Sequence, residues 1–481
     1  MTDTSKPFFL QALDALKLGD RRGAASLLER QLRGGNTAAK NLPSVSQLAA
    51  HIGEIDLAIE ASRRAVVPGS LETLLDYWAT LASYGRSQQA VAEAERLPGV
   101  KDHPSALHFR GTAATQFGRF DEAQELFRNA LAKQPAIAAT WLSLAMIKTF
   151  SSGDPDVASM EKLERQSTGQ PDARAILCYA LGKAWDDCGD PTRAFDYYSR
   201  GAALCRLRSG FDPAQFGAAA DEVIRSFTPE NLARLKRSGF DRQRSLFVTG
   251  LPRSGTTVTE QILRGHSGVR DGDELNLFNA ALIPTMGIGA ANALAYQERS
   301  DYLDPWGEIG RDYGHFIDMR FRSPGLVVDK SLGQSLTTGL MLHALPQARV
   351  AWLRRSPEDV ALSCFRTYFS TGLPWTWSLT DIADHMRAED RLFEHWRTLF
   401  ADRILVVPYE DLVRSPAAWA EKLQQHFGLP IEEAIESRSK ADRAISSASV
   451  SQARKPISAS RIGQAAAFEP FLKPFRDRYY V

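Results

Sequence analysis

Cysteine is scarce in this chain, and its few positions show no arrangement typical of a disulfide framework. The cysteines among the 481 residues are Cys178, Cys188, Cys205 and Cys364. Such usage is typical of a reducing compartment, in which buried thiols stay unpaired. No group of histidines and cysteines has the spacing of a metal site, so we expect no metal requirement.

Long apolar runs and a strong net charge are also lacking. No uninterrupted apolar stretch reaches the roughly 18 residues of a membrane-spanning helix, and the first residues do not follow the pattern of a secretory signal. We therefore expect a cytoplasmic protein without a transmembrane segment. The formal net charge of +1 gives no general attraction to nucleic acid, so no nucleic-acid partner is expected. The length allows two or three domains.

The first half of the chain is predicted to be an array of helix pairs. A glycine followed five residues later by an alanine recurs at Gly19/Ala24, Gly53/Ala58, Gly85/Ala90, Gly118/Ala123, Gly153/Ala158 and Gly189/Ala194. Consecutive glycines are 34, 32, 33, 35 and 36 residues apart, which is the tetratricopeptide period. We expect about six such repeats in residues 1–206, stacked into a superhelix. Its concave face would bind a protein or peptide partner, or the array would pack against the rest of the chain or mediate dimerisation.

The second half is predicted to fold as a P-loop-like α/β domain. Residues 207–240 indicate a helical linker, and the domain would cover residues 241–481. Strand candidates at 245–249, 325–329, 348–353 and 403–407 alternate with helical patterns such as 417–427. This alternation favours a mostly parallel sheet with helices on both faces, whose ligand lies at the carboxyl ends of the strands. Gly250, Lys330 and Arg355 each fall at such an end.

The segment between the first strand and the next helix has the features of a phosphate-binding loop. It reads Gly-Leu-Pro-Arg-Ser-Gly-Thr-Thr over residues 250–257. The glycines let the backbone approach an anion, the hydroxyls and helix N–H groups donate hydrogen bonds, and the arginine adds charge. The predicted binding residues are Pro252, Arg253, Ser254, Gly255, Thr256 and Thr257. The residue before Thr256 is glycine, so the lysine of a Walker A loop is missing, which favours a donor other than ATP.

Further blocks lie at predicted strand ends. The segment Val-Val-Asp-Lys ends at Lys330, and another strand runs into Arg354 and Arg355, with Ser363 eight residues after the second arginine. The planar fork of an arginine suits phosphate oxygens. Together with the loop at 250–257, these blocks resemble the sulfotransferase family, and the tyrosylprotein sulfotransferases most closely, over roughly the last half of the chain.

The resemblance implies 3′-phosphoadenosine-5′-phosphosulfate (PAPS) as the donor. It implies that the loop at 250–257 holds the 5′-phosphosulfate and that Arg355 with Ser363 holds the 3′-phosphate, although Arg354 stays an alternative to Arg355. A late segment at 449–457 resembles the family's loop over the cofactor, which implies contacts from Ser449 and Lys455. The tryptophan that the family often has a few residues further on is absent here.

The resemblance also implies the catalytic residues. Glu274 matches the general base of the tyrosylprotein sulfotransferases, twenty-one residues after Arg253, with Asp273 as the less favoured carboxylate. Lys330, helped by Arg253, would stabilise the bridging oxygen and the leaving group. His266 is a further candidate base, but a capping role at its helix end is preferred.

We therefore expect a PAPS-dependent sulfotransferase that acts on an acceptor hydroxyl, in which an N-terminal all-helical array precedes the α/β domain. The acceptor stays open among a peptide tyrosine, a glycan and a small molecule. Loops at 276–324 and 367–392 would form its pocket, but their aromatic residues are expected in the core: Trp306, Tyr313, Trp375 and Trp377. The alternatives are an ATP- or GTP-dependent phosphotransferase with a variant P-loop and a non-catalytic repeat scaffold with a nucleotide-binding domain.

Overall fold

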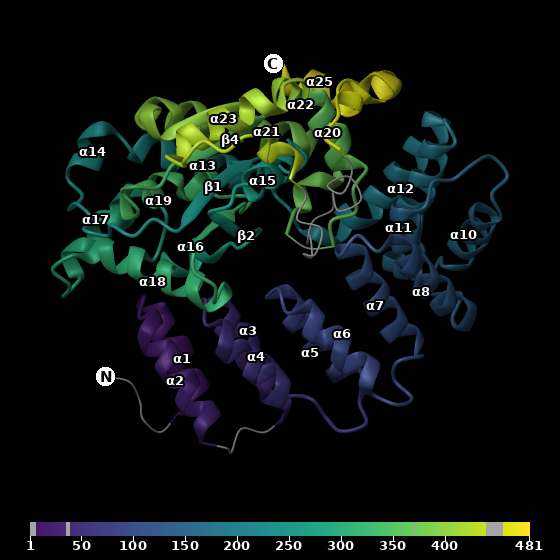
Figure 1. Ribbon diagram of the computed structural model, residues 1–481, viewed down its shortest axis with the longest axis horizontal. Helices are drawn as coiled ribbons and strands as arrows, with labels where there is room; N and C mark the ends of the chain where they lie inside the picture. Colours follow the sequence, from purple (N-terminus) through teal and green to yellow (C-terminus); the bar gives the residue numbers. More distant parts are fainter. Residues whose placement is uncertain (1–5, 35–38, 371, 439–455) are drawn as a thin grey trace.

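The computed structural model describes residues 6–34, 39–370, 372–438 and 456–481, and it consists of two parts. The N-terminal part is an arc of helices, and the C-terminal part is built around a sheet. In Figure 1 the arc runs from the purple N-terminal helices, below the sheet-containing part, to α11 and α12 at its right-hand side. The predicted order of a helical region followed by an α/β region is confirmed.

The arc is built from consecutive helix pairs joined by short turns. The pairs are α1 (Phe8–Lys17) with α2 (Arg21–Arg33), α3 (Leu42–His51) with α4 (Ile55–Arg64), α5 (Leu71–Ser83) with α6 (Ser87–Arg96), α7 (Pro104–Gln116) with α8 (Phe120–Lys133), α9 (Ala138–Ile147) with α10 (Pro155–Gln166), and α11 (Pro171–Asp187) with α12 (Pro191–Ser209). A 3-10 turn, η1 (Ala39–Asn41), precedes α3.

The predicted glycines lie in the turns within these pairs. The φ angles are 75° at Gly19, 84° at Gly53, 72° at Gly85, 76° at Gly118, 82° at Gly153 and 76° at Gly189. Glycine adopts this left-handed region without the steric cost that a Cβ adds. The recurrence of glycine in the sequence therefore marks real turns, whereas the tetratricopeptide class itself stays a prediction.

The linker region contains two helices that pack on the α/β part. They are α13 (Pro213–Ser226) and α14 (Pro229–Ala233). Val223 and Phe227 belong to the same core as Trp396 of α21 (Leu379–Leu399). The last helix of the arc ends at Ser209, three residues beyond the predicted end at 206.

The sheet has five parallel strands in the order β2-β3-β1-β4-β5. The strands are β1 (Ser245–Gly250), β2 (Val269–Asp273), β3 (Leu326–Asp329), β4 (Val350–Arg354) and β5 (Ile404–Pro408). Four of them match the predicted strands. The fifth, β2, was not predicted, because its sequence Val-Arg-Asp-Gly-Asp is polar, contains glycine and lacks an apolar pattern.

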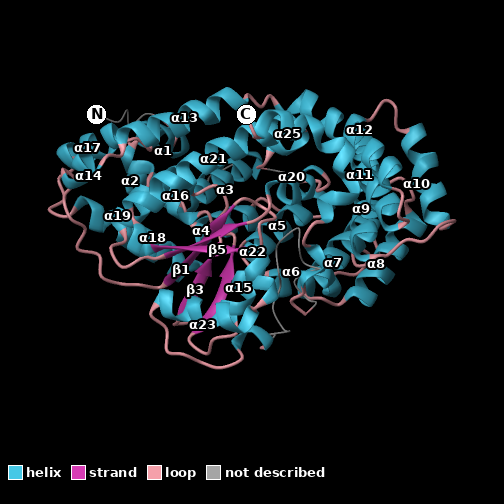
Figure 2. Cartoon of the chain, turned by 90° about the horizontal axis from the view of Figure 1, so that it is seen from above, coloured by secondary structure: helices cyan, strands magenta, loops and turns pink. Residues whose placement is uncertain are grey.

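Helices cover both faces of the sheet, as Figure 2 shows for the magenta strands. Along the buried strand β1, Leu246 and Val248 pack with α15 (Thr256–Arg264) and α23 (Pro416–Phe427). Phe247 points to the opposite face, in the core shared with α18 (Pro305–Arg320), α19 (Thr338–Ala344) and α21. This alternation is the period of two expected for a strand buried on both faces.

The remaining elements of the α/β part are short helices and turns. They are α16 (Leu277–Ala281), η2 (Ile283–Thr285), α17 (Ala290–Arg299), η3 (Ser335–Thr337), α20 (Pro357–Phe365), η4 (Pro374–Trp377), η5 (Ala401–Arg403), α22 (Tyr409–Arg414), η6 (Ile435–Ser437), η7 (Ala459–Arg461), η8 (Gln464–Leu472) and α25 (Lys473–Tyr479).

Both ends of the arc pack against the α/β part. At the N-terminal end, a Cβ on Gly53 would lie 2.8 Å from the ring of Phe316 in α18. At the other end, Tyr198 of α12 shares a core with Phe365 of α20 and Trp375 of η4. Packing against the rest of the chain, one of the predicted uses of the array, is therefore found.

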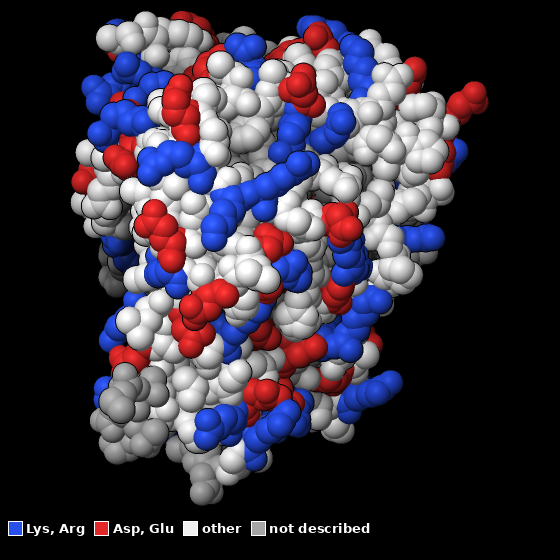
Figure 3. Space-filling model, turned by 90° about the vertical axis from the view of Figure 1, so that its left-hand side faces the viewer, with Lys and Arg blue, Asp and Glu red and all other residues white. Residues whose placement is uncertain are grey.

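The surface carries charges of both signs. On the face shown in Figure 3, Lys and Arg side chains are interspersed with Asp and Glu, in line with the formal net charge of +1. None of the described helices combines the length and the apolar character that crossing a bilayer requires.

Candidate functional site

The loop after β1 passes through three residues with left-handed φ angles. They are Gly250 (142°), Arg253 (69°) and Gly255 (109°). A Cβ on Gly255 would lie 2.5 Å from the ring of Tyr409, and one on Gly250 would lie 2.8 Å from the carbonyl oxygen of Leu353. Both positions therefore require glycine, which lets the loop pass close to its neighbours. The loop ends at the N-terminus of α15, where backbone N–H groups lack helical partners and favour an anion.

A cavity borders this helix N-terminus and brings together three of the predicted blocks. Its walls include Arg253, Thr256 and Thr257 of the loop, Arg355 after β4 and Ser363 of α20. Its other lining residues are Gly255, Val258, Gln261, Tyr409, Val413, Pro456, Ile457, Ser458, Ser460, Arg461 and Gln464. Residues far apart in the sequence therefore form one site of hydroxyl and guanidinium donors.

Arginines make the cavity electropositive. Burial and the nearby guanidinium of Arg366 lower the pKa of Arg253 to about 10, and Arg461 and Arg355 add to this effect. Nε of Arg253 donates to Oγ of Ser363 at 3.0 Å. A bound anion would relieve the mutual repulsion of these cations.

Three groups hold Arg355. Oδ2 of the buried Asp359 accepts a hydrogen bond from Nη2 of Arg355 at 3.3 Å. Nη1 of Arg355 donates to the carbonyl oxygen of Arg253 at 3.0 Å, and its Nη2 donates to that of Arg461 at 2.6 Å. Its Cζ lies 4.5 Å from the centre of the Tyr409 ring. Nε of Arg355 is buried without a hydrogen-bond partner among the described residues. Buried donors are normally satisfied, so this one fits a ligand atom.

Arg354 points elsewhere. Its Nη1 forms an ion pair with Oδ1 of Asp390 at 2.5 Å, and its Cζ lies 4.8 Å from the centre of the Phe393 ring, both on α21. Adjacent residues at a strand end face opposite sides. Of the two arginines that the sequence left open, it is Arg355 that lines the cavity.

Two of the predicted loop residues are turned inward. Oγ of Ser254 donates to the carbonyl oxygen of Leu251 at 2.7 Å, and the carbonyl oxygen of Pro252 accepts a weak hydrogen bond from Sγ of Cys364 at 3.5 Å. Both residues are buried and lie outside the described cavity lining. Their contacts shape the loop.

Lys330 and Glu274 meet at the other side of β1, after the paired strands β2 and β3. Nζ of Lys330 donates to Oε1 of Glu274 at 2.5 Å. Lys330 is only 2% exposed, whereas the Glu274 side chain is 32% exposed and so can be reached by a ligand. Burial opposes the charge of Lys330, but the carboxylates of Glu260 and Glu274 outweigh it and raise the Lys330 pKa. Neither residue belongs to the described lining of the arginine cavity.

Glu260, on the buried face of α15, was not singled out from the sequence. Its Oε2 lies 4.0 Å from Nζ of Lys330, and its Oε1 lies 3.6 Å from Nη1 of Arg264. Burial raises the pKa of Glu260 to about 6, although Lys330 and Arg264 act in the opposite direction. A charged residue among the core positions of the loop helix was the signal that could have found it.

Other predicted positions have structural surroundings. Nε2 of His266 lies 2.9 Å from the carbonyl oxygen of Pro430, and Nδ1 accepts from the N–H of Gly268, so this histidine ties down the end of α15. The four candidate aromatic residues are buried in the core, as expected: Trp306, Tyr313, Trp375 and Trp377. Ser449 and Lys455 lie outside the described residues. Within the described part of the chain, no cluster of three or more metal-ligating side chains occurs.

Several further cavity residues were missed, among them Tyr409, Arg461 and Gln464. Tyr409 directly follows β5, so the rule that ligands bind at strand ends could have indicated it. Arg461 and Gln464 follow the predicted late loop in a stretch without periodic pattern, so their position depends on tertiary packing.

The sheet and the loops of this site lie in a segment that matches a known protein family. Residues 245–433 match the family model of the sulfotransferase family. The match supports assigning this segment to that family, whereas a tyrosylprotein-like subgroup and tetratricopeptide repeats stay predictions.

One protein sequence and two solved structures show further likenesses. An uncharacterized protein of Aquifex aeolicus (strain VF5) is 26% identical over 399 residues, which are 79% of this chain and 50% of the relative, so the chain spans about half that protein's length. The sulfotransferase domain of the Synechococcus PCC 7002 olefin synthase is 20% identical, covers 48% of this chain and 90% of its own, and has a TM-score of 0.35. Mouse sulfotransferase SULT7A1 complexed with PAP is 15% identical over 53% of this chain and 90% of its own, with a TM-score of 0.30.

Proposed function

We propose that this protein is a sulfotransferase that uses PAPS as its donor and transfers the sulfuryl group to an acceptor hydroxyl. One observation carries the proposal: a single cavity beside the N-terminus of α15 is lined by Arg253, Arg355 and Ser363. These groups fit a doubly phosphorylated nucleotide because they provide several cations and hydroxyls together with an N–H of Arg355 that has no hydrogen-bond partner among the described residues.

In this proposal the loop at 250–257 holds the 5′-phosphosulfate, while Arg355 and Ser363 hold the 3′-phosphate. PAPS supplies a sulfuryl group whose bond to the phosphate oxygen breaks as a new bond to the acceptor oxygen forms. Lys330 and Arg253 stabilise negative charge on the leaving phosphate. What supports this division is the strand order, in which β3 and β4 flank β1 and place Lys330 and Arg355 on opposite sides of the loop.

Glu274 takes the proton of the acceptor hydroxyl in this proposal. Two observations support this role: the carboxylate of Glu274 is partly exposed, and its contact with Lys330 holds it at the end of β2. Asp273 is less suited to the task, because its Oδ2 is engaged by Nη2 of Arg320 at 2.9 Å. The acceptor in this proposal is a hydroxyl of a peptide tyrosine, a glycan or a small molecule.

The Glu274→Gln variant tests the proposal. Conversion of PAPS to 3′-phosphoadenosine-5′-phosphate (PAP) is followed by chromatography with a tyrosyl peptide, a simple glycoside and a phenol as acceptors. We expect turnover to fall by about 10²-fold or more, because the base is lost, while PAP affinity is unchanged. Glu298→Gln, at an exposed glutamate of α17, is the matched control. Turnover by Glu274→Gln equal to that of the control would remove Glu274 as the base.

A further inference from the structure

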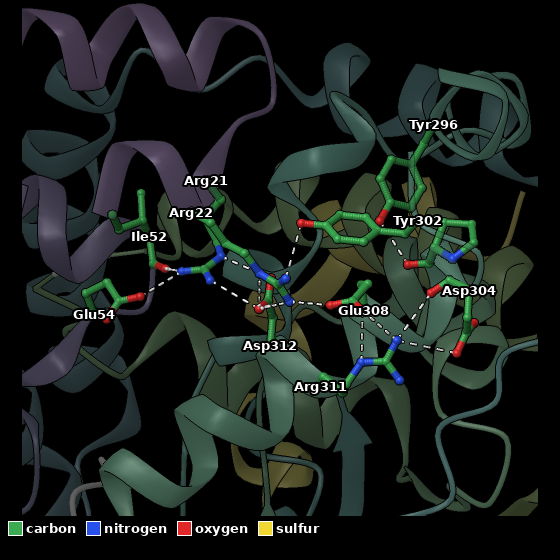
Figure 4. A network of polar contacts seen from close by, with 11 residues as sticks. Arg21, Arg22, Ile52, Glu54, Tyr296, Tyr302, Asp304, Glu308, Arg311 and Asp312 are labelled. Carbon is green, nitrogen blue, oxygen red and sulfur yellow. Dashed lines mark hydrogen bonds and ion pairs between the residues drawn. The ribbon is translucent and has the colours of Figure 1, made fainter. Parts of the chain in front are cut away.

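The helical arc is attached to α18 by a partly buried ion-pair network. Nη1 of Arg21 pairs with Oε1 of Glu54 at 2.8 Å, and Nε of Arg21 donates to Oδ2 of Asp312 at 3.2 Å. Nη2 of Arg22 pairs with Oε2 of Glu308 at 2.6 Å. Figure 4 shows both arginines of α2 pointing toward the two carboxylates of α18, Asp312 and Glu308. Since Arg21 is only 3% exposed, solvent screens this attachment little.

The turns of the first three helix pairs contact the α18 side of the α/β part. A Cβ on Gly19 would lie 3.1 Å from the carbonyl oxygen of Pro284, and one on Gly53 would meet Phe316. One on Gly85 would lie 2.6 Å from Cζ of Arg320, the last residue of α18. By contrast, no atom of the residues that the structure describes lies within 4 Å of the Cβ position at Gly153 or Gly189.

Arg320 fills the space between the Gly85 turn and the end of β2. Its Nη2 pairs with Oδ2 of Asp273 at 2.9 Å, and the side chains are 10% and 19% exposed. A Cβ on Gly85 would occupy the place of this guanidinium, so the turn leaves room for it only because it carries glycine. The glycine turn and the carboxylate of Asp273 therefore border the same group on two sides.

Asp273 in turn orders the backbone of both proposed catalytic residues. Its Oδ1 accepts a hydrogen bond from the N–H of Glu274 at 2.9 Å, and its carbonyl oxygen accepts one from the N–H of Lys330 at 3.0 Å. A change in the position of Asp273 would therefore shift the base and the cation together.

We propose that Arg320 is a positioning residue for the Glu274–Lys330 pair, and that the turn at Gly85 keeps it in place. The helical arc is then a working part of the active site. This inference rests on the proposed sulfuryl transfer, in which both residues of the pair act. It concerns the transfer step and leaves nucleotide binding to the arginine cavity on the other side of β1.

Gly85→Ala tests the inference, with Gly153→Ala as its matched control. The φ angles at these positions are 72° and 82°, so both alanines carry similar backbone strain, but only the one at position 85 displaces a guanidinium. We expect Gly85→Ala to lower PAPS-to-PAP turnover by about tenfold or more relative to the control, because small displacements of catalytic groups are costly. PAP affinity, measured by calorimetry, should stay within about twofold of wild type.

Arg320→Gln should lower turnover to a similar extent, Arg320→Lys should restore part of it, and Gly85→Ala should have no further effect in the Arg320→Gln background. Two results would overturn the inference: equal turnover of Gly85→Ala and Gly153→Ala, or effects on turnover that multiply in the double variant. Unchanged PAP binding by the same variants would still support the nucleotide site. Wild-type protein that binds PAP but converts no PAPS with any acceptor would contradict the proposed function and, with it, this inference.

Discussion

At the scale of single residues, burial lowers the pKa of a buried histidine and raises the pKa of a buried carboxyl group. On α21, burial lowers the pKa of His385 to about 3 and raises that of Glu389 to about 7. The His385 ring stacks on Trp375 at 4.1 Å between centres, and its Nδ1 has no hydrogen-bond partner among the described residues. Nε2 of His385 lies 3.7 Å from Oε1 of Glu389, but burial favours the uncharged form of both groups, so the folded protein keeps His385 neutral.

The His385→Phe variant should reveal this penalty through the pH dependence of stability. The pKa of His385 is lower in the folded protein than in the unfolded chain. The contribution of the neutral histidine to stability is therefore fully present above about pH 6.5 and is lost as pH falls toward 3. From pH 7 to pH 5 the wild type should lose about 2 kcal/mol of unfolding free energy relative to His385→Phe, which keeps a ring against Trp375. Denaturant unfolding of both proteins at the two pH values measures this. A difference between them that does not change with pH would contradict the account.

Residues at strand ends and in the loop could be predicted, and residues placed by tertiary packing could not. Arg253 and Arg355 stood out because a glycine-bearing turn and an arginine at a strand end are local patterns, whereas Ser363 followed from the family resemblance. The strand rule does not say which of two adjacent arginines lines the cavity; in the structure Arg355 does, and Arg354 pairs with Asp390. Nothing in the sequence near Arg461 indicated that it lines the same cavity.

At the scale of elements, the four apolar strands and the loop helix were predicted nearly in register. The sequence predicted a helix directly after the loop at 250–257, and α15 at Thr256–Arg264 is that helix. Strand β2 was not predicted, because its sequence is polar and its pairing with β3 comes from the fold. That omission matters for the site, since β2 ends at Asp273 and so fixes Glu274 beside Lys330.

The tight loop between β1 and α15 gives a prediction of its own. Gly255→Ala should weaken PAP binding about tenfold or more, because a Cβ there meets the ring of Tyr409 and pushes the loop amides out of place. The control is Gly428→Ala at the end of α23, which also has a positive φ, 67° against 109° at Gly255, and no atom of the described residues within 4 Å of its Cβ position. Calorimetry should show wild-type PAP affinity for this control. Equal affinities of the two variants would mean that the loop does not hold the nucleotide.

At the scale of the whole molecule, the sequence indicated the parts but not how they pack. The period of the turn glycines predicted the helix pairs, because one geometry recurs at each turn. The docking of the arc on α18 uses isolated contacts such as Arg21 with Asp312, which follow no period. The turns at Gly19, Gly53 and Gly85 are nevertheless among the contacts of the arc with the α/β part, and in our proposal the turn at Gly85 joins the arc to the site.

The central claim is that the arginine cavity binds the nucleotide of PAPS, and calorimetric titration with PAP tests it without knowledge of the acceptor. Wild type and Arg354→Ala should bind PAP, because Arg354 is paired with Asp390 away from the cavity. Arg355→Ala should bind at least about tenfold more weakly, because charged hydrogen bonds to phosphate are lost. If folded wild type does not bind PAP, or Arg355→Ala binds it as tightly as wild type, the account is contradicted; binding of ATP with Mg²⁺ instead would favour the phosphotransferase alternative.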